Sequence, residues 1–332
     1  MSKLAIIGGG GWGTALACVL AARFDSVALW MHEVDLASTV EQTRSNQVFL
    51  PGVQLPLNVE VGSSLASALD AADIVLSVMP SHVVRAVYSQ MAPLLHPGTP
   101  LVSATKGLEA GTLERVSEVI RSVVGQEFPI GVLTGPTFAS EVANGNPTAL
   151  VAASADADLA QTLQHRFSGP TFRVYASSDT IGAEIGGSLK NVIAIGAGIC
   201  DGLELGHNAL AALITRGLAE LTRLAVAAGG RAETMAGLAG LGDLVLTCTG
   251  DLSRNRQVGM KLARGLKLGD ILGATPMVAE GVKTTSVAIQ LAARLGVELP
   301  ITEQMHAVLN EGKAPSDAIR ELMGRTLKSE GI

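Results

Sequence analysis

Lys190 is the only charged side chain within residues 185–200, a stretch of otherwise apolar or small residues. A helix that is apolar on nearly every side is buried, and lysines are rarely buried without a partner or a function. Desolvation lowers the pKa of an amine, which favours Lys190 as a general base or acid near neutral pH. The alternative is a structural lysine paired with Glu184 or Asp243, and pairing can coexist with catalysis.

Asp243 and Lys106 are charged residues next to apolar runs. Asp243 stands alone within residues 240–249 and is a natural partner for a buried cation. Lys106 follows the apolar run 101–104, so it should lie at the carboxyl end of a strand, where doubly wound sheets bind ligands. Two interpretations of Lys106 fit equally well: a contact with a substrate oxygen, or an ordinary solvated loop lysine.

Two arginines follow a predicted helix start. Ser253 has the residue type of an N-cap, with Arg254 and Asn255 in the first turn and Arg256 directly after them. A cation there opposes the helix dipole, so the arginines indicate an anion at the helix end. Arginine is suited to bidentate phosphate binding, and a solvated basic turn remains open for Arg256. Nearby Cys248 is expected to be a packed apolar residue rather than a nucleophile.

Near the N-terminus, Gly8, Gly10 and Gly13 form a G-x-G-x-x-G pattern between a predicted strand and a predicted helix. Gly8 allows a tight turn, Gly10 lets the backbone approach a pyrophosphate, and Gly13 lets the helix pack close to the strand. The pattern predicts a dinucleotide site. Glu33, at the end of the next strand, favours the free 2′-hydroxyl of NAD, whereas a protonated His32 would help to hold the 2′-phosphate of NADP. The choice between NAD and NADP stays open.

Short apolar runs alternate with alanine-rich helical stretches in the first half of the chain, and helices alone fill the second half. The predicted strands are residues 4–8, 27–31, 74–79, 101–105, 130–133, 149–152 and 172–175. The predicted helices are residues 14–23, 64–71, 113–123, 185–199, 209–228, 256–266, 282–295 and 301–309. This order predicts an α/β fold, a Rossmann-like doubly wound parallel sheet in residues 1–178 followed by an all-helical domain in residues 179–332.

Composition excludes several classes of function. Of the 332 residues, 48% are hydrophobic and 16% charged, which favours two well-packed domains. A net charge of −6 and 3% aromatic residues argue against a nucleic-acid partner. The 3 cysteines and 6 histidines are scattered, so we expect no disulfide framework and no metal, and a cytoplasmic location. Glycines interrupt the uncharged N-terminal run, and no other stretch is long and apolar enough to cross a membrane.

The residues also resemble those of a known family, bacterial glycerol-3-phosphate dehydrogenase [NAD(P)+]. The similarity runs in order from Ala5 to about Arg325. The segments that carry it are the glycine loop at 8–13, LPG at 50–52, VMPSH at 78–82, ATKGLE at 104–109, GPTFA at 135–139, KNVIAIGAG at 190–198, GLGDL at 240–244, SRN at 253–255 and EG at 280–281. The segments around Lys106, Lys190 and Asp243 are more specific than the glycine loop.

The resemblance implies reversible hydride transfer between sn-glycerol 3-phosphate and dihydroxyacetone phosphate, supplying glycerol 3-phosphate for phospholipid synthesis, and a homodimer. It implies Lys190 as the proton acceptor for the C2 hydroxyl. The implied substrate residues are Lys106, Gly135, Thr137, Lys190, Asp243, Ser253, Arg254 and Asn255. The implied cofactor contacts, together with the loop glycines Gly8, Gly10 and Gly13, are Gly11, Trp12, His32, Lys106, Ala139, Arg254, Val278 and Glu280.

Gly11 and Trp12 depart from the usual family pattern, in which serine and then tyrosine or phenylalanine stand at these positions. Either difference would alter cofactor affinity rather than activity. Two alternatives stay open: a related dehydrogenase of a hydroxy acid or a sugar acid phosphate, and a dinucleotide-sensing module without catalysis. Lys106 with Ser253, Arg254 and Asn255 argues against the first, and the presence of Lys190 and Asp243 argues against the second.

Overall fold

The computed structural model describes residues 1–274, 279–327 and 329. Contacts divide the chain into two compact units. Unit 1 contains Met1–Thr105 and Val116–Thr180, and unit 2 contains Lys106–Arg115 and the chain from Ile181 onward. The predicted division between residues 178 and 179 did not anticipate that the segment Lys106–Arg115, which lies far upstream of it, packs as part of unit 2.

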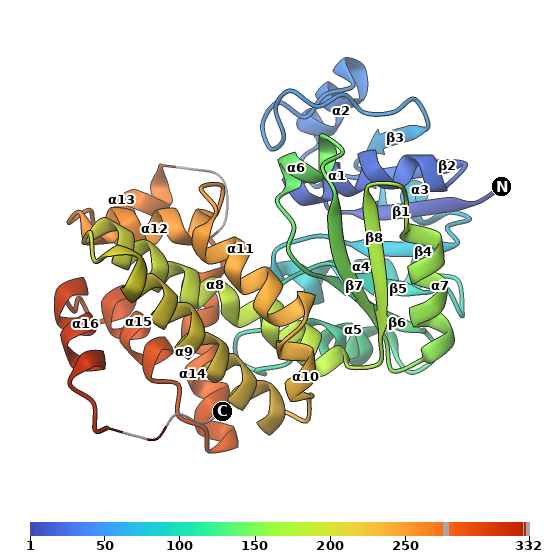
Figure 1. Ribbon diagram of the computed structural model, residues 1–332. Helices are drawn as coiled ribbons and strands as arrows, with labels where there is room; N and C mark the ends of the chain where they lie inside the picture. The colour runs from blue at the N-terminus through green and yellow to red at the C-terminus, as the bar shows by residue number, and fades with distance from the viewer. Residues whose placement is uncertain (275–278, 328, 330–332) are drawn as a thin grey trace. The chain divides into compact units, whose positions relative to one another are not determined.

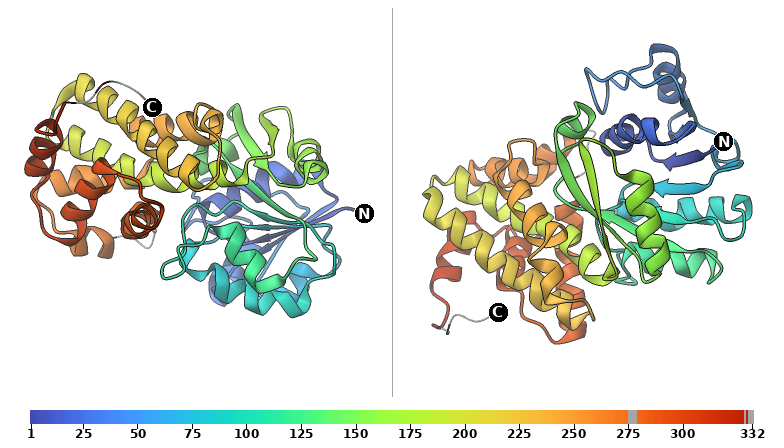
Figure 2. Two further views of the ribbon diagram at one scale, coloured as in Figure 1. Left: turned by 90° about the horizontal axis from the view of Figure 1, so that it is seen from below. Right: turned by 45° about the vertical axis from the view of Figure 1, so that its right-hand side comes forward.

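Unit 1 is built on one sheet of 8 strands in the order β3-β2-β1-β4-β5-β6-β7-β8. The strands are β1 (Lys3–Ile7), β2 (Ser26–Trp30), β3 (Val59–Gly62), β4 (Ile74–Ser77), β5 (Leu101–Ser103), β6 (Ile130–Thr134), β7 (Thr148–Ala153) and β8 (Phe172–Ser177). The first six follow the order of a dinucleotide-binding sheet, in which ligands bind where the order reverses next to β1. Figures 1 and 2 show the strands and the helices that cover the sheet.

Helices cover both faces of this sheet, as the doubly wound prediction requires. They are α1 (Gly11–Leu20), α2 (Val34–Thr43), α3 (Leu65–Leu69), α4 (Val84–Met91), α5 (Val116–Val124), α6 (Ala139–Ala143) and α7 (Ala157–Phe167). One core joins the sheet to α1, α2, α6 and α7, and a second core joins its other face to α3, α4 and α5. The central strands, such as β4, β5 and β6, are buried along their whole length because both faces of the sheet are covered.

The observed sheet departs from the prediction at two places. Strand β3 at the edge of the sheet was missed, because Glu60 and Gly62 alternate with its two valines and only one face is buried. Strand β7 pairs antiparallel with β6, whereas a parallel arrangement was expected. The chain reverses between these two strands through the segment that contains α6, so β7 returns along β6 instead of crossing over.

Unit 2 consists of helices around the long central helix α8. They are α8 (Thr180–Gly202), α9 (Gly206–Ala227), α10 (Ala232–Met235), α11 (Asp243–Thr249), α12 (Arg254–Ala263), α13 (Leu268–Gly273), α14 (Glu280–Leu295), α15 (Pro300–Asn310) and α16 (Pro315–Met323). Every residue of α8 from Gly182 to Cys200 is buried, and Figure 1 shows the other helices of unit 2 around it. Unit 2 confirms the predicted all-helical second part of the chain.

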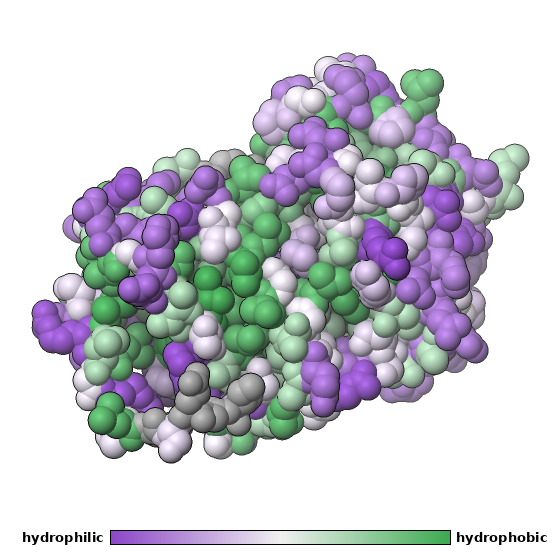
Figure 3. Space-filling view, viewed as in Figure 1, coloured by the Kyte–Doolittle hydropathy of each residue, from purple (hydrophilic) through white to green (hydrophobic). Residues whose placement is uncertain are grey.

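The surface of unit 2 is apolar in one area, which Figure 3 shows over α9 and α11. Separately, the large apolar residues of unit 2 that have exposed side chains include Leu205, Val226, Leu241, Val245 and Leu252. Among the described residues, no helix combines the length and the hydropathy needed to cross a membrane.

Candidate active site

Two glycines of the N-terminal loop are required by close backbone packing. Gly8 has a φ of +124°, and a Cβ atom on it would lie 2.1 Å from the carbonyl oxygen of Val78. A Cβ atom on Gly13 would lie 1.8 Å from the carbonyl oxygen of Gly8, so α1 could not approach β1 with any side chain there. These contacts confirm the predicted reasons for both glycines, the tight turn and the close packing of helix on strand.

Gly10 differs, because a Cβ atom built on it would meet no atom within 4 Å. The space lies at the N-terminus of α1, which begins at Gly11, has Gly10 as its N-cap and has no acidic residue in its first turn. The first backbone N–H groups of a helix have no intrahelical acceptor and favour an anion. Open space beside unbonded amides therefore suits the pyrophosphate of a dinucleotide.

The segment Gly135 to Ala139 lies next to this loop within unit 1. Gly135 has a φ of +143° and approaches Leu150 so closely that a Cβ atom would lie 2.9 Å from its Cα atom. Thr137 Oγ1 donates to the carbonyl oxygen of Gly135 at 3.2 Å, and α6 then begins at Ala139. Helix α6 packs on α1, and a Cβ atom on Gly11 would lie 3.9 Å from the Cβ atom of Ala139.

Gly11 has a structural reason to lack a side chain. A Cβ atom there would lie 2.7 Å from the carbonyl oxygen of Phe49, so a serine would require the loop to shift. Trp12 is half-buried and packs against the core that joins the sheet to α1, α2, α6 and α7. Its indole Nε1 is buried and has no hydrogen-bond partner among the residues that the structure describes.

His32 and Glu33 follow β2, the strand next to β1 in the sheet, and both are exposed. The imidazole of His32 lies 6.0 Å from the ring of Trp30, measured between ring centres. Glu33 precedes α2, and its side chain makes no capping hydrogen bond. Both side chains are therefore accessible at the end of the strand.

The charged centre of unit 2 is the Asp243 carboxylate, which binds two lysines. Its Oδ1 atom accepts from Lys190 Nζ, and its Oδ2 atom accepts from Lys106 Nζ at 2.6 Å. The side chain of Asp243 is 0% exposed, that of Lys190 7% and that of Lys106 16%. The structure thus identifies Asp243 as the partner of Lys190, and it shows that Lys106 is not an ordinary solvated lysine.

Close packing of α8 against the start of α11 brings Lys190 and Asp243 together. A Cβ atom on Gly186 would lie 2.4 Å from the carbonyl oxygen of Ala239. Lys190 and Asp243 each follow these contact residues by four positions along their own helical segments. Asp243 begins α11 directly after the π-helical segment Leu238–Gly242, and such wide turns are frequent at functional sites. Glycine at Gly186 therefore sets the distance at which the two charges meet.

Burial lowers the pKa of Lys190 to about 7. The Asp243 carboxylate opposes this shift, because it favours the ammonium form. The positive charge of Lys106 lowers the pKa further. A lysine with such a pKa can accept or donate a proton near neutral pH. The buried centre consequently has the property that was predicted for a general base or acid.

Ser253 and Asn255 hold the first turn of α12. Ser253 is the N-cap, and its Oγ accepts from the backbone N–H of Arg256 at 3.3 Å, which confirms the predicted cap. Asn255 is buried; its Nδ2 donates to Asn191 Oδ1 at 3.0 Å, and its Oδ1 accepts from the backbone N–H of Gly281 at 3.1 Å. Asn255 therefore ties α12 to the residue after Lys190 and to the first turn of α14, which begins at Glu280.

The two arginines of this turn have different environments. Arg256 binds Asp201 through Nε at 2.7 Å and Asp251 through Nη1 at 2.9 Å, so its guanidinium is committed to structural ion pairs. These ion pairs argue against Arg256 as an anion ligand. Arg254 is more exposed; partial burial lowers its pKa, and the Glu280 carboxylate opposes that shift.

Several further expectations can be placed in the structure. Glu184, considered as a partner for Lys190, binds Arg115 instead at 2.6 Å. Cys248 is fully buried, and burial raises its pKa to about 12, as expected of a packed apolar residue. Val278 lies outside the described residues. Among the residues described, no cluster of three or more histidine, cysteine, aspartate or glutamate side chains could hold a metal ion.

Asn191 is a buried polar residue beside Lys190 that the sequence argument passed over. It lies beside Lys190 in the buried helix and contacts both Asn255 and the backbone at Gly281. Its signal was an amide side chain next to Lys190, the only charged residue within the apolar stretch 185–200. Buried amides need partners, so such a residue predicts a polar network around the lysine.

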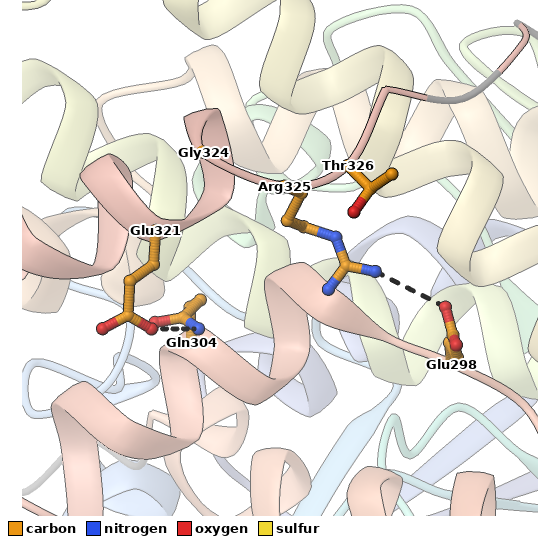
Figure 4. Close-up of a pocket in the computed structure, with 6 residues that line it drawn as sticks. All are labelled: Glu298, Gln304, Glu321, Gly324, Arg325 and Thr326. Atoms are coloured by element: carbon orange, nitrogen blue, oxygen red, sulfur yellow. Dashed lines mark hydrogen bonds and ion pairs between the residues drawn. The ribbon is translucent and has the colours of Figure 1, made fainter.

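A surface hollow of unit 2 is distinct from these residues. It has a volume of about 550 Å³ and is lined by Glu298, Gln304, Glu321, Gly324, Arg325 and Thr326 (Figure 4). Its charges are paired, since Arg325 lies 3.4 Å from Glu298 and Gln304 donates to Glu321 at 3.1 Å. None of the expected site residues lines it, so it carries no part of the site.

Comparison with known proteins places both parts of the chain in one family. Residues 3–160 match the family described as "NAD-dependent glycerol-3-phosphate dehydrogenase N-terminus", and residues 179–320 match the corresponding C-terminus. A relative from Koribacter versatilis named "Glycerol-3-phosphate dehydrogenase [NAD(P)+]" is 59% identical over 334 residues, which cover 99% of each chain. A relative of the same name from Geobacter sulfurreducens is 53% identical over 330 residues, covering 99% of this chain and 98% of its own.

Solved structures agree with the sequence relatives. The crystal structure of glycerol-3-phosphate dehydrogenase from Coxiella burnetii has a TM-score of 0.94 and 41% identity, covering 98% of this chain and 99% of that one. The glycine loop of unit 1 and the lysine–aspartate centre of unit 2 thus lie in a fold shared along the whole chain. The protein belongs to the family of NAD(P)-dependent glycerol-3-phosphate dehydrogenases.

Proposed function

We propose that the protein catalyses reversible hydride transfer between sn-glycerol 3-phosphate and dihydroxyacetone phosphate. The observation that carries the proposal is the buried Asp243 carboxylate with Lys190 on one oxygen and Lys106 on the other. Family membership supplies the substrate class, and the centre supplies a titratable amine in a desolvated place. NAD or NADP, held at the glycine loop around Gly10, would supply the hydride acceptor for oxidation and the hydride donor for reduction.

Lys190 is the residue proposed to move the proton. In the oxidative direction its neutral amine accepts the proton of the C2 hydroxyl, and in the reductive direction its ammonium returns a proton to that oxygen. Asp243 orients the amine through its Oδ1 atom and keeps a counter-charge beside the ammonium when it forms. Lys106, on the other carboxylate oxygen, supplies a positive charge to a substrate oxygen.

The phosphate of the substrate is assigned to Arg254 at the first turn of α12. Ser253, Asn255, Gly135 and Thr137 complete the proposed substrate set. Arginine offers two parallel N–H groups to a phosphate, and the N-terminus of α12 adds a favourable helix dipole. Arg256 is left out, because Asp201 and Asp251 already bind its guanidinium.

The cofactor is assigned to the glycine loop and to the residues that surround it. The open space at Gly10 and the start of α1 at Gly11 support a pyrophosphate site. The proposed contacts are Gly8, Gly10, Gly11, Trp12, Gly13, His32, Lys106, Ala139, Arg254, Val278 and Glu280. We further propose a cytoplasmic homodimer that supplies glycerol 3-phosphate for phospholipid synthesis.

The test is an assay of the purified protein with dihydroxyacetone phosphate and either NADH or NADPH, following absorbance of the reduced cofactor. Turnover with one or both cofactors is expected, and their kcat/KM ratio gives the cofactor preference. A 2-keto acid in place of dihydroxyacetone phosphate is the matched control for the related dehydrogenases of hydroxy acids. Folded protein that turns over only the keto acid, or neither compound, would overturn the proposal. Light scattering of the same sample measures the oligomeric state.

A further inference from the structure

We propose that Glu184 and Ser188 of α8 are positioning residues that hold both ends of the segment Lys106–Arg115 and thereby fix Lys106 against Asp243. This inference rests on the proposed function, because it assigns Lys106 its place in that reaction. Neither residue touches the reacting atoms in the scheme above. Their effect would pass entirely through the backbone that carries Lys106.

The first anchor lies directly after Lys106. The backbone N–H of Gly107 donates to Ser188 Oγ at 3.0 Å, and the Ser188 hydroxyl donates to the carbonyl oxygen of Glu184 at 2.7 Å. Ser188 is 1% exposed, so water does not compete for this pair of hydrogen bonds. Gly107 has a φ of +148°, a conformation that favours glycine and turns the chain as it leaves Lys106.

The second anchor lies at the other end of the segment. Arg115 Nη1 lies 2.6 Å from Glu184 Oε2, and the two side chains are only 13% and 3% exposed. Removing one partner of a buried ion pair leaves the other charge desolvated, which makes such a contact costly to break. One turn of α8, from Glu184 to Ser188, therefore holds the segment at Gly107 and at Arg115.

The segment between the anchors is closed on itself. Leu108 and Arg115 form an antiparallel bridge, and the backbone N–H of Glu109 donates to the carbonyl oxygen of Glu114 at 2.9 Å. Leu108 is 3% exposed and belongs to the same core cluster as Ile185 and Leu189 of α8. The segment is thus a packed part of unit 2, and its position depends on α8.

Fixing this backbone matters because of what Lys106 does at the centre. A lysine ammonium is a point charge on a flexible stem of four carbons, so its position depends on where its backbone is anchored. The groups that influence or contact Lys190 from neighbouring segments include Asp243, Lys106 and the thiol of Cys248. A displaced Lys106 would both weaken substrate binding and remove a positive charge that disfavours the ammonium form of Lys190.

The experiment uses Glu184→Gln and Ser188→Ala in the full-length protein, each alone and combined with Lys106→Met. Each single variant should lower kcat/KM for dihydroxyacetone phosphate about 10-fold to 100-fold, the size expected of a catalytic group misplaced by about 1 Å. In the Lys106→Met background the same changes should add no more than about twofold, because the group that they position is gone. If each change lowers kcat/KM by the same factor in the wild type and in the Lys106→Met variant, the inference is overturned.

Glu220→Gln is the matched control, because Glu220 is another buried carboxylate of unit 2. It accepts hydrogen bonds from the backbone N–H groups of Ile301 at 2.5 Å and Thr302 at 3.1 Å, at the start of α15. Glu220→Gln should lower Tm and leave kcat/KM unchanged. If Glu184→Gln behaves in the same way, the anchor is only structural and the inference is wrong.

Hydrogen exchange of the amides in residues 106–115, followed by mass spectrometry, gives a readout that needs no activity. Exchange should become faster in Glu184→Gln and Ser188→Ala and stay unchanged in Glu220→Gln; unchanged exchange in the first two overturns the inference. Ser188→Ala removes a single hydroxyl and keeps the test open if Glu184→Gln does not fold. A wild-type protein without turnover would refute the proposed function, and exchange would then decide the anchoring separately.

Discussion

The glycine loop of unit 1 and the lysine–aspartate centre of unit 2 differ in the groups that they offer to a ligand. The loop uses backbone: contiguous residues, no charged side chain, and open space where Gly10 lacks a Cβ atom. The centre uses side chains that come from distant positions, with Lys106 and Lys190 separated from Asp243 by 137 and 53 residues in the sequence. One site is local in the chain, and the other exists only in the folded unit.

This difference follows from what each site has to do. An anion of fixed shape can be held by backbone N–H groups at a helix end, which carry no net charge and titrate at no pH. A proton has to be exchanged by a group with a pKa near 7, and burial is the main cause that lowers the pKa of Lys190 to about that value. The loop therefore requires space and the centre requires desolvation, so substitutions should affect them differently.

The largest expected effect is at the centre. Lys190→Ala should lower kcat by about 10²-fold to 10⁴-fold, because it removes the proposed acid–base group. Binding of NADH or NADPH at the glycine loop of unit 1 should remain as in the wild type, as measured by fluorescence titration. A kcat close to that of the wild type, with a normal circular dichroism spectrum, would show that another residue exchanges the proton.

At the glycine loop, Gly13→Ala and Gly10→Ala form a matched pair. The new Cβ atom in Gly13→Ala would lie 1.8 Å from the carbonyl oxygen of Gly8, so we expect a loss of stability of about 3 kcal/mol or failure to fold. The methyl group in Gly10→Ala meets no protein atom and should leave Tm unchanged. It should raise KM for the cofactor about tenfold, or about 1.4 kcal/mol, because it fills the space at the pyrophosphate. Equal Tm values for the two variants would contradict the packing argument.

The two arginines of α12 allow a similar separation within unit 2. Arg254→Ala should raise KM for dihydroxyacetone phosphate about 10-fold to 100-fold, the loss expected for charged hydrogen bonds, with little change in Tm. Arg256→Ala should instead lower stability by about 1 kcal/mol, because it breaks the pairs with Asp201 and Asp251, and should change KM little. Steady-state kinetics gives KM and thermal unfolding gives Tm for both variants. A raised KM in Arg256→Ala and a lowered Tm in Arg254→Ala would reverse the roles assigned to the two arginines.

The last prediction concerns the dependence of the rate on pH. Lys190 must be neutral to accept a proton, so kcat for glycerol 3-phosphate oxidation should rise with pH and level off above about 7. Below that pKa the oxidative rate should change about tenfold per pH unit. The reductive rate needs the ammonium form, so it should be level below the pKa and fall above it. Lys106→Met removes a charge that lowers the pKa of Lys190, so the inflection should move to higher pH. A profile that stays flat between pH 6 and pH 8, roughly one unit on either side of that pKa, would contradict the assignment.

Much of the fold and part of the site followed from local patterns. Every strand expected from apolar runs is present, whereas β3 at the edge was missed because its residues alternate in polarity. Burial of Lys190 followed from the apolar residues around it, and Ser253 was recognised as a helix cap from its type and place. Asn191 was passed over, because its partners Asn255 and Gly281 are distant in sequence.

The amino-acid sequence by itself determined the glycine loop, the alternating sheet and the presence of a buried amine, because each depends on residues that are close along the chain. Only the tertiary structure decided how the charges pair. In the structure Lys190 and Lys106 both pair with Asp243, and Glu184 pairs with Arg115. The segment Lys106–Arg115 belongs to unit 2. The physical reason is that pairing depends on the approach of distant backbone segments, such as Gly186 against Ala239, which no local pattern specifies.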